Sequence, residues 1–90
     1  MIVKSLAILK GKKFMDEQFT RISHNIDIMG GKACIKGTRV TVGMILIQIS
    51  EGKSVEELLK EYPYLSFDDI MQALKYAAWT VNAKESMISV

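Results

Sequence analysis

The sequence has little of several residue types on which small proteins often depend. It contains one cysteine, one histidine and one proline in 90 residues. A single cysteine excludes an internal disulfide framework, and His24 with Cys34 falls short of the about four ligands of a structural zinc site. Cys34 lies in a predicted strand and is expected to be a small packed residue rather than a nucleophile. We therefore expect no metal, no cofactor and no enzymatic activity.

Long apolar runs are also absent. No run approaches the about 20 residues needed to span a bilayer. The apolar stretch at residues 2–9 is followed by lysines, where a signal peptide would need small residues. We therefore expect a cytoplasmic protein with no membrane partner.

What the chain does contain is a hydrophobic share of 49%, enough for one packed domain. Its net charge of +2 arises from four lysines before Met15, because the other eight cations face ten anions. Met15 is an alternative start, since Met15-Asp16-Glu17 opens a polar lead-in. With that start, the charge of the whole chain would not favour nucleic acid.

The most informative segment is Gly30-Gly31-Lys32-Ala33-Cys34-Ile35-Lys36-Gly37-Thr38-Arg39-Val40. Glycine supplies positive φ at no steric cost, so the segment predicts forced turns and a hairpin or sharp strand bend around Gly37-Thr38. Lys32, Lys36 and Arg39 gather cations on this bend, which we name the basic corner. A stiff basic corner ahead of a helical unit indicates a binding module. The structural turns expected along the chain lie at Gly30, Gly31, Gly37, Gly52 and Pro63.

The first predicted helix covers about residues 42–50, with Thr41 as its cap and Gly52 just beyond its end. It is apolar on nearly every side, so it must be buried all round or pair with another copy. On so small a domain this pattern favours a homodimer. The residues assigned to the core or to a dimer interface are Met44, Ile45, Ile47, Ile49 and Trp79.

Two further helices are predicted. The capping box Ser54-Val55-Glu56-Glu57 begins a short amphipathic helix, and Pro63 stops it. Ser66 caps a third helix with a long apolar stripe, which is predicted to end at residue 82 or 83. The segment from residue 30 to 53 is thus basic, and the later helical part at residues 55–75 is acidic.

Ahead of the corner we expect a short strand at residues 19–22 and a loop at residues 23–31. The fold class is mainly α with a short N-terminal β hairpin, in a three-helix domain that is homeodomain-like or winged helix-turn-helix-like. Residues 1–18 are expected to form an N-terminal extension, residues 19–83 the domain and residues 84–90 a tail. Such a topology alone is weak evidence for DNA binding, because fold does not imply function.

These features resemble a known family, the one catalogued as domain of unknown function 433. The resemblance covers roughly residues 19–83. It rests on Ile35-Lys36-Gly37-Thr38-Arg39-Val40, Gly52-Lys53-Ser54-Val55-Glu56-Glu57-Leu58-Leu59 and Tyr62-Pro63-Tyr64-Leu65-Ser66. It implies a small prokaryotic helix-turn-helix-like protein. Several members are regarded as antitoxins, similar to the VapB type, which bind and silence PIN-like ribonuclease toxins. Such antitoxins are commonly dimers, and many repress their own operon, so we expect an antitoxin-like protein.

The main cationic candidate for DNA contact has a structural alternative. Arg39 can hold a phosphate through two parallel hydrogen bonds, or it can pair with an internal acid such as Asp27 or Asp69. Acidic residues in the first turn of the third helix disfavour docking in the major groove, so the basic corner is expected to contribute more. The alternative function is a protein-interaction or dimerisation module, or a transcriptional regulator, without a toxin partner. The candidate DNA contacts are Lys32, Lys36, Thr38, Arg39, Ser66, Gln72 and Lys75.

Overall fold

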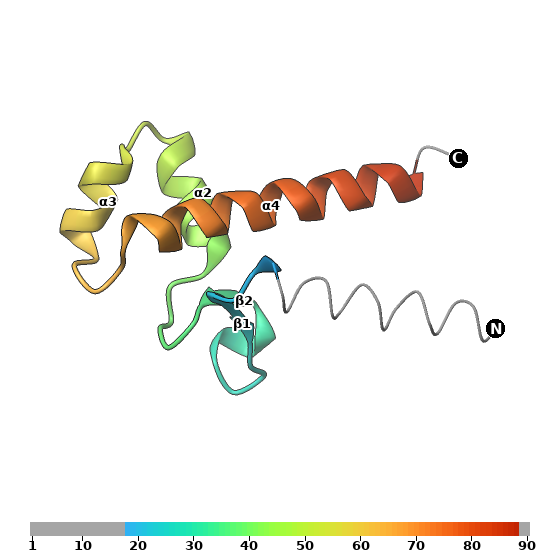
Figure 1. Ribbon diagram of the computed structural model, residues 1–90, viewed down its shortest axis with the longest axis horizontal. Coiled ribbons are helices and arrows are strands. Elements are labelled where there is room, and N and C mark those ends of the chain that lie inside the picture. Colours follow the sequence, from blue (N-terminus) through green and yellow to red (C-terminus); the bar gives the residue numbers. More distant parts are fainter. Residues whose placement is uncertain (1–17, 89–90) are drawn as a thin grey trace.

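In the computed structural model, residues 18–88 of the chain are described. They form a short hairpin followed by a mainly α domain (Figure 1). Helices α2 and α3 pack on the first half of α4, whose second half extends beyond the other elements. In chain order the elements are β1 (Ile22–His24), the 3-10 helix η1 (Met29–Gly31), β2 (Ala33–Ile35), α2 (Val42–Ser50), α3 (Val55–Glu61) and α4 (Phe67–Ile88). The three helices and the N-terminal hairpin confirm the predicted fold class.

The hairpin joins β1 to β2 in antiparallel pairing, with Ile22 opposite Ile35 and His24 opposite Ala33. The predicted strand at residues 19–22 is therefore displaced toward the C-terminus. Phe19 is buried, and its ring packs against Tyr76 of α4 at a centroid distance of 5.4 Å. Its side chain thus holds the start of the domain to α4 and is not part of the sheet.

The basic corner is a tight bend, as predicted. The backbone N–H of Ile35 donates to the carbonyl of Val40 at 2.9 Å, and Cys34 forms an isolated antiparallel bridge with Thr41. Gly37 lies at the tip with φ of 79°, a left-handed conformation that glycine adopts without strain. The bend therefore leads the chain from β2 directly into α2.

Local caps set the starts of all three helices. The Thr41 hydroxyl accepts from the Met44 N–H at 3.0 Å. Ser54 forms a complete capping box with Glu57 at the start of α3. Ser66 and Asp69 exchange backbone–side-chain hydrogen bonds in the same way at the start of α4. These caps satisfy N–H groups that the first turn of a helix leaves without partners.

Helix α4 is longer than predicted. It continues through residues 83–88 and ends at Ile88, beyond the expected end at residue 82 or 83. Ala83, Lys84 and Glu85 are good helix formers, and no glycine or proline follows to stop the helix. Most of the predicted tail is therefore helical.

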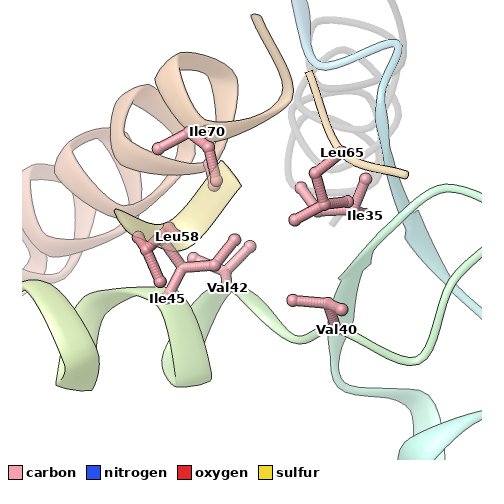
Figure 2. Close-up of a cluster of buried hydrophobic side chains, with 8 residues drawn as sticks. Ile35, Val40, Val42, Ile45, Leu58, Leu65 and Ile70 are labelled. Atoms are coloured by element: carbon pink, nitrogen blue, oxygen red, sulfur yellow. The ribbon is translucent and has the colours of Figure 1, made fainter. Parts of the chain in front are cut away.

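One apolar cluster joins the hairpin to the three helices (Figure 2). Ile45 of α2, Leu58 of α3 and Ile70 of α4 are fully buried and meet at its centre. Ile35 and Val40 bring the hairpin and the basic corner against the same cluster. The corner is therefore fixed relative to α2 and α4.

Candidate functional site

Helix α2 presents apolar side chains on two opposite faces. Ile45 is 0% exposed in the core, and Ile49 packs partly buried against the core. On the other face Met44 and Leu46 are each 36% exposed, and Ile47 is 60% exposed. The residues predicted for the core or a dimer interface are thus divided between the two environments.

The exposed face of α2 forms one wall of an open apolar groove, which we name the α2–α4 groove. It encloses about 550 Å³. Gly43, Leu46 and Ile47 line it from α2, and Tyr76, Ala77 and Val81 line it from α4. The small residues Gly43 and Ala77 leave space between the two helices. A concave apolar surface of this size is a feature of binding sites in general.

An aromatic cluster supports the α4 wall of the groove. The Tyr76 ring packs against Phe19 on one side, and its hydroxyl lies 3.0 Å from the His24 Nε2 atom. Trp79, which was predicted for the core or an interface, contacts Phe19 at a centroid distance of 5.9 Å. These contacts fix the orientation of Tyr76, so the groove wall is preformed.

The basic corner lies next to the groove. Lys32, Lys36 and Arg39 are exposed, and Lys32 also lines the groove. Thr38 serves the bend itself, because its hydroxyl donates to the Ile35 carbonyl at 2.8 Å and accepts from the Val40 N–H at 3.0 Å. The cationic side chains of the corner thus stand on a backbone that Thr38 stabilises.

Asp69 has a different arginine partner from the one considered from the sequence. Arg21, ahead of β1, forms an ion pair with Asp69 at 2.9 Å. Within the described part of the chain, Arg39 forms no ion pair with Asp27 or Asp69. Burial acts to raise the pKa of Asp69, but hydrogen bonds from Ser66 and Arg21 outweigh it and lower the pKa below its ordinary value. Arg39 therefore keeps its charge available at the surface.

Among the candidate DNA contacts on α4 and at its cap, two have structural roles and one is exposed. Ser66 is the cap of α4, and the Gln72 side chain accepts a hydrogen bond from the Arg21 backbone. Lys75 is exposed, on a polar hollow shared with Arg21 and Gln72. The structure therefore gathers Lys32, Lys36 and Arg39 at the corner and separates them from the three candidates around α4.

A polar network fixes α2 against α3. Lys53 forms an ion pair with Glu61, and the hydrogen bond from its ammonium group to that carboxylate raises the pKa of Lys53. Lys53 also donates to the Gln48 side chain at 3.1 Å, and Gln48 donates to the Tyr62 hydroxyl at 3.0 Å. This network holds the angle between α2 and α3 and so supports the α2 wall of the groove.

The sequence did not indicate the α4 wall of the groove or the role of Arg21. The signal that could have found the groove is the surplus of apolar residues in α2, more than one core-facing side of a helix can bury. Ala77 and Val81 belong to the apolar stripe expected for the third helix, whereas Tyr76, which packs partly buried against the core and also lines the groove, was not part of that stripe.

Among residues 18–88, no three His, Cys, Asp or Glu side chains are grouped to hold a metal ion. In the same residues, no helix has the length and apolarity to cross a membrane.

Comparisons with known proteins place this domain in a family. The fold matches the crystal structure of a DUF433 member from Anabaena variabilis with a TM-score of 0.68 at 23% identity, over 92% of this chain and 82% of that one. The uncharacterized protein y4eO of Sinorhizobium fredii is 36% identical over 56 residues, which are 62% of this chain. The chain spans only 25% of the length of that relative. The family model described as a protein of unknown function (DUF433) matches residues 22–77, more than half of the sequence. The chain therefore belongs to the DUF433 family.

Proposed function

We propose that this protein is an antitoxin-like binding module that takes a partner protein in the α2–α4 groove. The exposed apolar groove is the observation on which the proposal rests. Ile47 and Val81 are 60% and 55% exposed on its two walls. Apolar side chains gathered in a concave surface gain free energy when a partner covers them. Two helices with a gap between them are also suited to an amphipathic segment of a partner.

The partner proposed from the resemblance is a PIN-like ribonuclease toxin. An antitoxin of this kind acts by stoichiometric binding, so a shaped surface is sufficient and no reactive group is required. The preformed Tyr76 wall and the fixed angle between α2 and α3 favour this, because a rigid site loses little conformational entropy on binding.

The first experiment is purification of the tagged chain from its native host, with co-purifying proteins identified by mass. We expect a small PIN-like nuclease in equal amount. Its RNA cleavage should then fall with added wild-type chain but not with the Ile47→Asp variant. Ile26→Asp is the matched control, because Ile26 is 77% exposed and lies outside the groove. Recovery of the chain alone would instead favour an interaction module or regulator without a toxin partner.

A second candidate function is binding to the protein's own operator, supported by the exposed basic corner. Lys36 and Arg39 stand on a rigid bend, an arrangement suited to contacts with phosphate groups. With these contacts, affinity for operator DNA would fall steeply as salt is raised. Charge reversal at Lys36 and Arg39 should abolish binding to operator DNA, whereas Lys60→Glu on α3 should leave that binding unchanged. Unchanged binding of the reversed variant would reject this role for the corner.

The homodimer is the third part of the proposal. Because Ile45 and Ile49 serve the core, α2 has only Met44, Leu46 and Ile47 left for a second copy. These residues belong to the α2–α4 groove. A second copy on this face and a partner protein would therefore compete, and light scattering with and without the partner measures that competition.

A further inference from the structure

We propose that a polar hollow beside α4 binds the oxyanion of a small organic molecule, either a phosphate or a carboxylate group. The hollow, which we name the Arg21 hollow, encloses about 440 Å³. Its lining residues are Gln18, Phe19, Arg21, Asp68, Met71, Gln72 and Lys75. None of them lines the α2–α4 groove, so this site is independent of the proposed function.

The Arg21 hollow and the groove use different faces of α4. Asp68, Gln72 and Lys75 follow one another by four and three residues, so they form one row along the helix. Ala77, which lines the groove, follows Gln72 by five residues, which is about 140° around the helix. A ligand in the hollow and a partner protein in the groove can therefore be bound at the same time.

Arg21 is held in place by contacts within the domain. Its backbone N–H donates to the Gln72 side chain, and its guanidinium Nη1 donates to the Asp69 Oδ1 atom at 2.9 Å. The other oxygen of Asp69 accepts the Ser66 N–H at 2.9 Å, so the carboxylate is itself fixed. The Arg21 side chain is still 45% exposed, and its other N–H groups remain for a ligand. A guanidinium held in this way loses little conformational entropy on binding.

The Gln72 amide has donors left for the hollow. A backbone N–H can only donate, so the Oε1 atom of Gln72 must face the Arg21 N–H. The other branch of the amide is then the Nε2 group, which has two N–H donors. Gln72 therefore adds neutral donors beside the guanidinium of Arg21.

Lys75 supplies a positive charge that no acid of the domain neutralises directly. It is exposed, and among residues 18–88 it forms no ion pair. Asp68 is the one carboxylate among the described lining residues, and it precedes Lys75 by seven residues, about 10 Å along the helix axis. The two ends of the row thus differ in sign, and an anion is favoured at the end formed by Gln72 and Lys75.

The chemistry of these groups matches an oxyanion. Guanidinium, ammonium and the amide Nε2 group all donate, and phosphate and carboxylate oxygens accept such bonds strongly because charge assists them. The volume lies in the range of sites for small organic molecules, about 300–1,000 Å³. Phe19 and Met71 add apolar surface to the lining. An organic anion therefore suits the hollow better than an inorganic ion alone.

The test is NMR titration of the full chain with two probes, inorganic phosphate and acetate, at an ionic strength held constant with sodium chloride. We expect the Gln72 side-chain amide and the Arg21 Nε–H signals to shift and saturate with at least one probe. Sodium chloride alone should not shift them. Saturation with phosphate only assigns a phosphate ligand, and saturation with acetate only assigns a carboxylate ligand.

Three variants test which groups hold the anion. Lys75→Gln should weaken binding of the saturating probe about fivefold, because a charge-assisted hydrogen bond is lost. Asp68→Asn should tighten it about twofold, because a like charge about 10 Å away is removed. Lys60→Gln on α3 is the matched control, since Lys60 is exposed and outside the hollow, and it should leave the affinity unchanged.

Three results would overturn the proposal. They are no saturable shift with either probe, unchanged affinity in Lys75→Gln, and shifts caused by a DNA duplex but by neither small anion. The last result would assign the hollow to a nucleic-acid interface. Ile47→Asp in the groove should leave probe affinity unchanged, so failure of the proposed function and failure of this site are measured separately.

Discussion

Asp69 connects three parts of the chain through one carboxylate. It is 8% exposed, accepts the Ser66 N–H at 2.9 Å and pairs with Arg21 at 2.9 Å. The start of α4 is therefore bound to the residue that precedes β1. The groove and the basic corner depend on this connection, because it fixes the hairpin against α4.

The lowered pKa of Asp69 makes stability depend on pH in the acid range. The folded chain favours the carboxylate more than the unfolded chain does. The contribution of Asp69 to the free energy of unfolding is therefore fully present above the ordinary Asp pKa of 3.8 and is lost as pH falls through the lower folded-state value. Urea unfolding measured from pH 6 down to about pH 2 checks this.

Asp69→Asn should remove that part of the acid dependence and lower the free energy of unfolding near neutral pH by about 1 kcal/mol. Asp68→Asn is the matched control, since Asp68 is exposed and is not the capping partner of Ser66. If the Asp69→Asn variant lost as much free energy of unfolding at acid pH as wild type does, another group would be responsible for the acid dependence.

At the scale of elements, substitution by alanine should have opposite effects on stability at Gly43, which lies within α2, and at Gly52, which lies just after it. Gly43 lies in the first turn of α2, where an added Cβ would meet only the Thr41 hydroxyl oxygen at 3.8 Å. Gly43→Ala should raise the free energy of unfolding by about 0.5–1 kcal/mol, because alanine loses less entropy in a helix. Gly52 ends α2 with φ of 99°. Gly52→Ala should lower the free energy of unfolding by about 1–2 kcal/mol, because a left-handed backbone strains an L-residue. Two effects of the same sign in urea unfolding would contradict this reading.

The two faces of α2 give a second prediction at this scale. Ile45→Ala should cost about 2–4 kcal/mol, because it leaves a cavity in the fully buried cluster of Figure 2. Ile47→Ala should change the free energy of unfolding by about 0.5 kcal/mol or less, since its side chain is largely exposed. Similar costs for the two variants in thermal or urea unfolding would mean that Ile47 is covered in the isolated protein.

Elements with local causes were predictable from the sequence, and pairings between distant residues were not. Thr41, Ser54 and Ser66 all cap helices as expected, because a cap depends on residues only three positions away. The exact position of β1 depends instead on Phe19 packing against α4, a contact across 57 residues of sequence. The ion pair of Asp69 with Arg21 is equally remote in sequence, so Arg39 was considered in its place.

The candidate site follows the same rule. The cations of the basic corner and the surplus of apolar residues in α2 are visible in the sequence. Their joining into a groove with Tyr76 and Ala77 depends on how α2 lies against α4, which no local pattern specifies. The predicted third-helix contacts illustrate the difference, because Gln72 is drawn into a hydrogen bond with the Arg21 backbone.

At the scale of the whole molecule, the described chain separates its charges and its exposed apolar surface. The basic corner and the α2–α4 groove adjoin each other, and most acids lie on α3 and the first turn of α4. A partner protein in the groove would cover the exposed apolar surface of α2 and α4. The central claim is that this partner binds in the α2–α4 groove.

The measurement that tests this claim most directly is calorimetric titration of the nuclease that we expect to co-purify into two variants of the full chain. Ile47→Asp places a charge in the groove, and Ile26→Asp places the same charge on exposed surface outside it. We predict that Ile26→Asp binds as wild type does and that Ile47→Asp binds about thirtyfold more weakly or not at all. Equal affinities for the two variants, with both folded, would contradict the assignment of the groove as the binding site.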